Sequence, residues 1–211
     1  MDNSSMVHLL EREGYIRSER VKRAFLMVDR AQFVPDENKS MAYFDEPLPI
    51  GHAQTISAPS MVAIMLELLN IEDGNKILEI GTGSGYNACL MACMGANVIS
   101  IERIPALCDF AKKNVEKCAC RERIKIMLGD GSVGYKKEAP YDRIIVTCGA
   151  PDIPPPLLEQ LKDGGIMVIP LGGTFFQELY VVKKERDKIL KRRWGDVAFV
   201  PLIGRYGHRW A

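Results

Sequence analysis

The stretch KILEIGTGSGY at residues 76–86 decides the fold that this sequence predicts. It begins with a short apolar run and passes through Gly81, Gly83 and Gly85 into a segment of helical character from Tyr86. Glycines at a strand-to-helix turn let the backbone approach a ligand closely and leave the helix amides facing it. The stretch therefore predicts a ligand-binding turn at the end of a strand, and an ordinary tight turn is the alternative.

The sequence on either side of this turn alternates short apolar runs with helical segments. The runs predict strands at residues 76–80, 98–101, 124–127, 143–147, 166–170 and 179–182, and the segments between them predict helices at 86–94, 105–117 and 132–137. Strands that are apolar throughout and separated by helices indicate a mostly parallel sheet covered on both faces. We therefore expect a doubly wound, Rossmann-like α/β domain. A last run at 189–194 predicts a C-terminal antiparallel hairpin with the strand at 179–182.

The residues before the sheet predict a helical extension followed by a long ordered loop. Ser18 is placed to cap a helix whose apolar residues recur at helical spacing as far as Val28. Residues 35–58 are rich in proline and lack periodicity, and a loop of this length inside a compact domain usually carries function. Residues 59–69 are apolar nearly all round and predict a buried helix.

The composition is that of an ordinary globular chain and excludes several classes of protein. The 211 residues are 47% hydrophobic and 26% charged, and 28 Lys and Arg residues are balanced by 27 Asp and Glu residues. No strong positive field is available to hold a nucleic-acid backbone, so we expect no nucleic-acid partner. No run reaches the ~18 apolar residues of a membrane-spanning helix, and charges come too early for a secretory signal. We expect a cytoplasmic protein that does not bind membranes.

The six cysteines are too few for a disulfide scaffold. Two pairs are close in sequence, Cys89 with Cys93 and Cys118 with Cys120, but neither has C-x-x-C spacing. Three scattered histidines complete no zinc set, so we expect no metal. Free thiols that pack as small hydrophobic groups are expected, with a metal or redox role as the alternative.

Two acidic residues follow two consecutive predicted strands. Glu102 lies about 20 residues beyond Gly81, where a carboxylate accepts hydrogen bonds from ribose hydroxyls. Asp130 follows the third strand, where it could accept from an adenine amino group. Tyr86 stands where a dinucleotide fingerprint has Gly or Ala. Together they favour a nucleoside ligand without phosphates, such as S-adenosylmethionine; solvated loop acids are the alternative.

The motifs around these residues resemble those of known enzymes. LEIGTGSGY (78–86), ISIER (99–103), LGDG (128–131) and YDRIIVTCGAP (141–151) resemble the successive motifs of class I S-adenosylmethionine-dependent methyltransferases. AYFDEPLPIGHAQTISAPSM (42–61), IPPPLLEQLKDGGIMVIPLG (153–172) and FVPLIGRYG (199–207) are similar to segments of protein-L-isoaspartate O-methyltransferases. The resemblance covers nearly the whole chain.

This resemblance implies an enzyme that methylates the free carboxylate of L-isoaspartyl residues in damaged peptides and proteins, which initiates their repair. S-adenosyl-L-methionine would be the methyl donor and S-adenosyl-L-homocysteine the product. The resemblance implies Ser57 as the active-site residue, within a flap at Gln54–Ser57, and Thr55 is a second candidate to orient the carboxylate. The remaining residues that it assigns to the cofactor are Ile56, Glu79, Gly81, Thr82, Gly83, Gly85, Glu102, Arg103, Asp130 and Gly131.

Two residues depart from the family pattern. Ser60 stands where many members have His, so that any hydrogen bond from that His is lost or replaced. Cys148 stands where members often have alanine, and it either lines the cofactor pocket or packs as a small residue. The closing strands of the family pair in an unusual order, on which the sequence gives no prediction.

The chemistry implied by the resemblance needs no catalytic base. A carboxylate with a reference pKa near 4 is already deprotonated at neutral pH and can attack a sulfonium methyl directly. The enzyme then has to align the reacting atoms. Ser57 would donate a hydrogen bond to the carboxylate, although its hydroxyl could instead cap the helix that follows. His52 is expected to be a loop residue.

Three other functions stay open: a methyltransferase of the same fold that acts on a small carboxylate or another small nucleophile, a nucleoside-binding module, and a nicotinamide-dependent dehydrogenase. For the methyltransferase we expect a monomer with one domain over residues 1–211. Its N-terminal helices and substrate flap occupy residues 1–58, and its cofactor-binding α/β core occupies residues 59–211.

Overall fold

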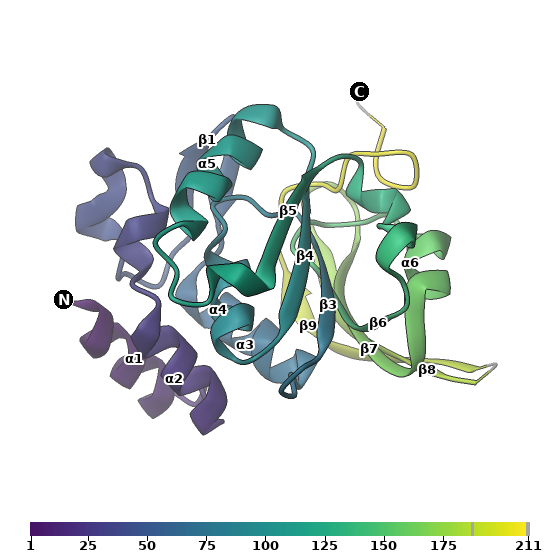
Figure 1. The fold of residues 1–211 in the computed structure, drawn as a ribbon, viewed down its shortest axis with the longest axis horizontal. Coiled ribbons are helices and arrows are strands. Elements are labelled where there is room, and N and C mark those ends of the chain that lie inside the picture. The colour runs from purple at the N-terminus through teal and green to yellow at the C-terminus, as the bar shows by residue number, and fades with distance from the viewer. Residues whose placement is uncertain (187, 210–211) are drawn as a thin grey trace.

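A seven-stranded sheet forms the centre of the computed structural model, which describes residues 1–186 and 188–209 (Figure 1). The strand order is β5-β4-β3-β6-β7-β8-β9. The strands are β3 (Lys76–Ile80), β4 (Asn97–Glu102), β5 (Ile124–Leu128), β6 (Tyr141–Val146), β7 (Leu161–Gly172), β8 (Gln177–Glu185) and β9 (Lys188–Val197). Strands β3 to β7 are parallel, whereas β8 and β9 are antiparallel to their neighbours. The predicted parallel sheet and C-terminal hairpin are confirmed, and the last three strands pair in simple chain order.

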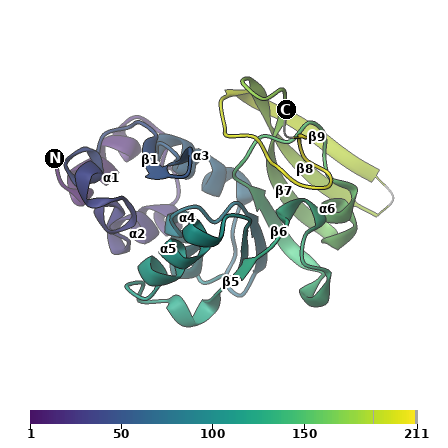
Figure 2. The same cartoon turned by 90° about the horizontal axis from the view of Figure 1, so that it is seen from above.

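Helices cover both faces of this sheet, as a doubly wound fold requires. Helices α3 (Pro59–Leu69), α4 (Tyr86–Cys93) and α5 (Pro105–Val115) lie on one side, and α6 (Pro155–Gln160) lies on the other (Figure 2). Neighbouring residues on a strand point to opposite faces. Ile77 accordingly belongs to the apolar cluster under α3–α5, and Leu78 belongs to the cluster under α6.

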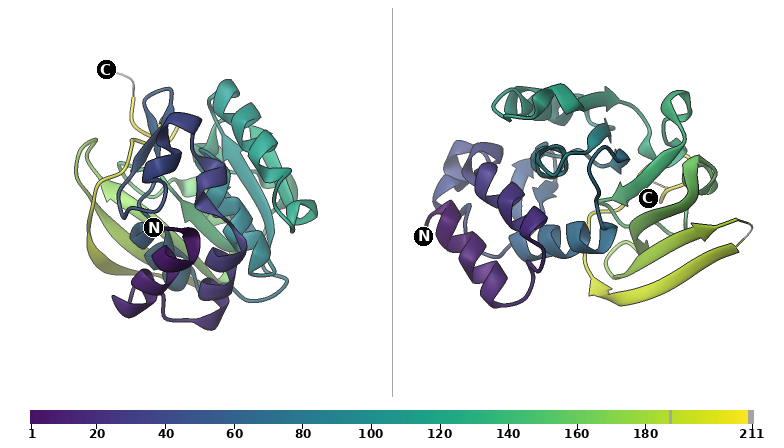
Figure 3. Two further views of the ribbon diagram at one scale, coloured as in Figure 1. Left: turned by 90° about the vertical axis from the view of Figure 1, so that its left-hand side faces the viewer. Right: turned by 60° about the horizontal axis from the view of Figure 1, so that its bottom comes forward.

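The N-terminal helices α1 (Asn3–Arg12) and α2 (Glu19–Met27) pack into the same apolar cluster as α3 and α4. Figure 3 shows them on the side of the molecule away from the β8–β9 hairpin. The predicted cap is present, because the Ser18 side chain accepts a hydrogen bond from the Val21 amide at 3.3 Å. Within the described parts of the chain, no helix is both long and apolar enough to cross a membrane.

The prediction of a loop over residues 35–58 is only partly correct. The segment from residue 30 to 56 contains the 3₁₀ helices η1 (Arg30–Phe33) and η2 (Asp36–Met41) and an antiparallel hairpin of β1 (Leu48–Gly51) and β2 (Gln54–Ile56). His52 and Ala53 form the turn of this hairpin, and both have positive φ. Asn or Gly usually supplies such turns, so the sequence did not indicate one here.

The helix predicted at residues 132–137 is absent. Two short 3₁₀ turns take its place, η4 (Gly131–Val133) and η5 (Lys136–Glu138), and a third, η3 (Arg121–Arg123), precedes β5. Gly134 lies between η4 and η5 with a φ of 66° and a ψ of −156°. These angles are outside the helical region, so one continuous helix cannot form here.

Candidate functional site

The glycine turn lies at the carboxyl edge of the sheet, between β3 and α4. Gly81, Gly83 and Gly85 all have positive φ, at 93°, 55° and 84°. A side chain on Gly81 would also collide with its neighbour, because its Cβ would come within 2.5 Å of Oγ1 of Thr147. The predicted turn at the end of this strand is present, and at Gly81 only glycine fits; its binding of a ligand stays a prediction.

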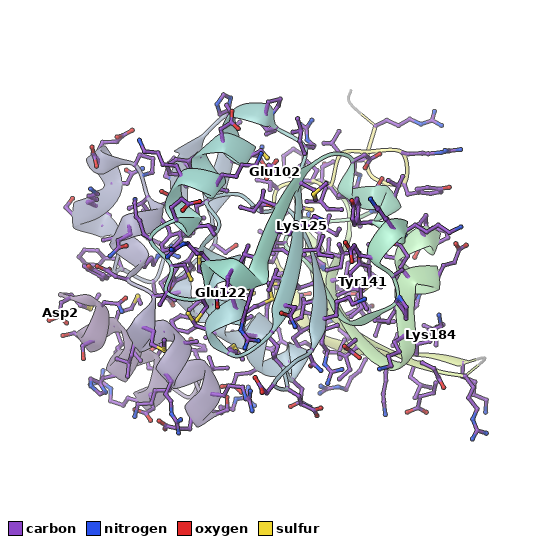
Figure 4. The ribbon with its side chains drawn as sticks, viewed as in Figure 1. Asp2, Glu102, Glu122, Lys125, Tyr141 and Lys184 are labelled. Carbon is purple, nitrogen blue, oxygen red and sulfur yellow. The ribbon has the colours of Figure 1, made fainter. Side chains whose placement is uncertain are left out.

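Glu102 ends the neighbouring strand β4 and fixes the glycine turn from the side. Its Oε2 accepts from the Gly83 amide at 2.9 Å, and its Oε1 accepts from the amides of Arg103 at 2.8 Å and Ile104 at 2.9 Å. The side chain is almost fully buried, yet it lines a pocket. Figure 4 shows Glu102 at the upper end of β4.

A first pocket of about 560 Å³ opens in front of these residues. Its polar wall includes Gly81, Gly83, Glu102 and Arg103, while Ile80, Ile101, Ile104 and Leu107 make an apolar wall. The segment 200–203 that follows β9 closes another side. Backbone hydrogen bonds hold that segment, from Gly149 to the Val200 carbonyl at 2.8 Å and from Leu202 to the Gly149 carbonyl at 2.7 Å.

Two further pockets adjoin the first one. The second lies beside the glycine turn, and the third lies between residues 57–61 and residues 198–200. Thr55 and Thr147 line all three pockets, and Ser57 lines the second and the third. The two residues that we expected to orient a substrate therefore stand where the pockets meet.

The hydroxyl of Ser57 is not a helix cap. The N-cap of α3 is Ala58, which has no capping side chain. Asp45 takes this role from 15 residues earlier in the chain, since its Oδ1 accepts from the Ser60 amide at 2.8 Å. Within residues 1–186 and 188–209 the hydroxyl of Ser57 makes no hydrogen bond, so it remains available to a ligand.

Arg30 holds the segment that carries Asp45. Its side chain is fully buried, and it donates from Nε to the Ala42 carbonyl at 2.9 Å and from Nη2 to the Glu46 carbonyl at 3.5 Å. The guanidinium carbon lies 5.4 Å from the centroid of the Tyr86 ring, within cation–π range. Burial lowers the pKa of Arg30 to about 10, so the group stays charged at neutral pH.

Comparisons with known proteins agree with this geometry. Residues 1–207 match the family profile described as protein-L-isoaspartate(D-aspartate) O-methyltransferase. The protein-L-isoaspartate O-methyltransferase of Hyperthermus butylicus is 55% identical over 215 residues, covering 97% of this chain and 89% of that protein. The one from Pyrococcus abyssi is 55% identical over 206 residues, covering 96% and 95%.

The chain belongs to this family.

A solved structure of the protein-L-isoaspartate O-methyltransferase family gives the same fold. It is described as the enzyme from Plasmodium falciparum in complex with S-adenosyl-L-homocysteine. It matches this chain with a TM-score of 0.87 at 30% identity, and the match covers 96% of this chain and 99% of that one.

Like Glu102, the other two acids that the family resemblance assigns to the cofactor, Glu79 and Asp130, have protein partners. Glu79 is fully buried beneath the glycine turn, where its carboxylate accepts from Ser100 Oγ at 2.5 Å and from Asn87 Nδ2 at 2.8 Å. Burial raises the pKa of Glu79 to about 7. It lines none of the three pockets, so the structure places it as a support beneath them.

Asp130 likewise bonds to the protein. Its Oδ1 accepts from the amide and the hydroxyl of Ser132, at 2.8 and 2.7 Å, and its Oδ2 accepts from the Arg205 amide at 2.8 Å. Gly131 lines the first pocket and Asp130 does not. The contact between Asp130 and adenine stays a prediction.

The other predicted residues occupy different parts of the site. Thr82 and Gly83 line the second pocket together with Ile56, whereas Gly85 caps α4 behind them. His52 is exposed at the β1–β2 turn, as expected of a loop residue. Cys148 lines the first pocket, and burial raises the pKa of its thiol.

Sequence reasoning missed Thr147, Asp45 and Arg30. Thr147 follows β6, and its hydroxyl lies 2.7 Å from the Gly81 carbonyl and 3.0 Å from the Ile80 carbonyl, to which it donates. The sequence could have indicated Thr147, because it is a polar residue at the carboxyl end of the strand predicted at residues 143–147. Asp45 and Arg30 gave no such signal, because their roles depend on contacts distant in sequence.

Proposed function

We propose that this chain transfers the methyl group of S-adenosyl-L-methionine to the free carboxylate of L-isoaspartyl residues in damaged peptides and proteins, with S-adenosyl-L-homocysteine as the product. The observation that carries the proposal is the meeting of three pockets at Thr55 and Thr147, beside the Ser57 hydroxyl, which has no hydrogen bond to any residue that the structure describes. Family membership over residues 1–207 supports the substrate class.

The residues of the first two pockets fit this cofactor. Both combine an apolar lining with a few backbone and side-chain polar groups, as is usual in pockets for small molecules. We propose that Glu102 accepts from the ribose hydroxyls and that Gly131 lies against the adenine. The glycine turn and Thr82 would hold the methionine portion. When bound there, S-adenosyl-L-methionine supplies an electrophilic methyl group on its sulfonium.

The groups around this point orient the acceptor without deprotonating it. A substrate carboxylate is already anionic at neutral pH, so the site needs donors and alignment. We propose that Ser57 donates a hydrogen bond to the carboxylate and that Thr55 donates a second one. Glu79 does not act as a base in this scheme, because it is buried beneath the turn and outside the pockets.

The third pocket suits an extended peptide. It lies between the start of α3 and the segment 198–200, and Ser57 and Thr55 stand at its inner end. An isoaspartyl residue places an extra methylene in the backbone, which moves its carboxylate relative to that of aspartate. We propose that only the shifted carboxylate reaches the hydroxyl of Ser57.

The domain and assembly predictions extend this proposal. We propose that residues 1–211 form one domain, because the N-terminal helices share an apolar cluster with the sheet and the flap residues reach the pockets. That this domain acts as a monomer stays a prediction. A cytoplasmic location and the absence of a nucleic-acid partner stay predictions.

A labelled-methyl assay tests the function. The protein receives radiolabelled S-adenosyl-L-methionine and one of two peptides that differ only in an aspartyl or isoaspartyl linkage. We expect base-labile label on the isoaspartyl peptide alone. Equal labelling of both peptides would contradict the proposed selectivity. If neither peptide were labelled and a small carboxylate were labelled instead, the protein would be a methyltransferase that acts on small molecules.

A further inference from the structure

Four of the six cysteines meet in one cluster outside the pockets. Cys89 and Cys93 lie one turn apart on α4, while Cys118 and Cys120 lie in the connection between α5 and β5. The sulfur atoms of Cys93 and Cys118 are 3.9 Å apart. Figure 4 shows sulfur atoms gathered beside Glu122, which belongs to the same connection.

The members of this cluster differ in exposure and in acidity. Cys89 and Cys118 are buried, whereas Cys93 and Cys120 are partly exposed. Hydrogen bonds from the thiols of Cys89 and Cys93 lower the pKa of Cys118, and the Cys120 amide donates to the same sulfur at 3.4 Å. Cys118 is therefore the member that most readily becomes a thiolate, which is the reactive form in disulfide exchange.

We propose that Cys93 and Cys118 form a reversible disulfide that ties the end of α4 to the α5–β5 connection. Their sulfur atoms have to approach from 3.9 Å to about 2.05 Å, and they sit on segments that already pack together. Among the residues that the structure describes, no group of three or more His, Cys, Asp or Glu side chains could hold a metal ion. This favours a disulfide over a zinc site.

The oxidant in this proposal is a small disulfide such as oxidised glutathione. Cys93, which is partly exposed, passes its hydrogen-bonded thiol proton to the Cys118 thiolate and attacks one glutathione sulfur. The other glutathione leaves as a thiolate and takes this proton from Cys118, which becomes a thiolate again. The Cys118 thiolate then attacks the Cys93 sulfur of this mixed disulfide and displaces the second glutathione. Both glutathione thiolates take up protons, so two protein thiols are oxidised and one glutathione disulfide is reduced to two thiols.

The cross-link would stabilise the fold without changing the site. It joins residues 25 positions apart, and closing a loop in the unfolded chain raises stability. For a chain of this size we expect the melting temperature to rise by about 5 °C or more on oxidation. None of the four cysteines lines the three pockets, so affinity for S-adenosyl-L-homocysteine should not change.

The test is a peptide map of the whole protein after incubation with oxidised or reduced glutathione. Trypsin leaves Cys89 and Cys93 together on the peptide 77–103 and Cys118 and Cys120 together on the peptide 118–121. Single variants therefore have to identify the bonded pair. They are Cys93→Ser and Cys118→Ser, with Cys89→Ser, Cys120→Ser and the helix α5 variant Cys108→Ser as matched controls.

We expect the oxidised protein to lose two hydrogen atoms in mass and to show peptide 77–103 linked to peptide 118–121. The link and the rise in melting temperature should disappear in Cys93→Ser and in Cys118→Ser and persist in the three controls. A link that survives in Cys93→Ser would overturn the assignment, as would the absence of any link in the wild-type protein. If the reduced wild-type protein bound one zinc ion per chain and Cys118→Ser bound none, the cluster would be a metal site and the disulfide proposal would be wrong.

Discussion

The glycine turn at residues 81–85 and the segment 42–58, which includes the flap at Gln54–Ser57, face the same pockets, but different interactions hold them. The turn is held by its own backbone geometry and by Glu102 on the adjacent strand. The segment 42–58 is held by Arg30, which bonds to two of its carbonyls, and by its own Asp45, which bonds to the start of α3. The glycine turn of the proposed cofactor half is thus specified mainly by nearby sequence, while the segment 42–58 of the proposed substrate half depends on long-range contacts.

The largest expected effect comes from Glu79, which lies in the cofactor half and should make the free energy of unfolding depend on pH. Its pKa is raised from 4.5 to about 7, so the neutral form is favoured in the folded state. The stability that it contributes is fully present below pH ~4.5 and is lost as the pH rises through ~7, on the order of 3 kcal/mol in total. Chemical denaturation of wild type and Glu79→Gln at several pH values measures it.

In Glu79→Gln this part of the pH dependence should be absent. Gln can accept from Asn87 and donate to the Ser100 hydroxyl, which can donate in turn to Thr82. Parallel stability profiles for the two proteins between pH 4 and 8 would show that Glu79 does not titrate in this range.

Glu102→Ala should weaken the cofactor half alone. Two ribose hydrogen bonds to a carboxylate contribute about 1.5 kcal/mol or more each, so affinity should fall about 100-fold. Calorimetry with S-adenosyl-L-homocysteine measures the loss, and the exposed Glu122→Ala serves as the control. Unchanged affinity would mean that the ribose lies elsewhere.

Ser57→Ala should affect the substrate half alone. Loss of one hydrogen bond to a carboxylate, worth about 1.5–3 kcal/mol, should lower turnover of an isoaspartyl peptide by about 10-fold to 100-fold. Calorimetry should show cofactor affinity unchanged. The exposed helix α1 variant Ser4→Ala is the control, and full turnover in Ser57→Ala would exclude this residue from the mechanism.

Asp45→Ala should have the smallest effect and should act through the flap. Removing a helix cap costs about 1 kcal/mol of folding stability. Because Asp45 also fixes the flap relative to α3, the peptide KM should rise several-fold while cofactor affinity is retained. Thermal denaturation and steady-state kinetics measure both, with exposed Asp36→Ala for comparison. An equal loss of cofactor affinity would show that the two halves are not independent.

The difference between local and long-range contacts also explains which features of the fold and the site the sequence could predict. The run at 76–80, the glycines and Glu102 are positioned by local geometry and a strand register, so a linear pattern reveals them. The β1–β2 hairpin was not predicted, because His52 and Ala53 adopt positive φ and their residue types do not indicate such a turn. Asp45 was not predicted, because a capping residue usually stands next to its helix, whereas Asp45 lies 15 residues before the Ser60 amide that it caps.

The segment 200–203 has a consequence for how the enzyme matures during synthesis. It forms one wall of the first pocket, yet it follows β9, so the ribosome makes it after every strand of the sheet. A nascent chain that has already exposed the glycine turn and Glu102 still lacks this wall. We therefore expect tight cofactor binding only after this segment has been made and has folded onto the pocket.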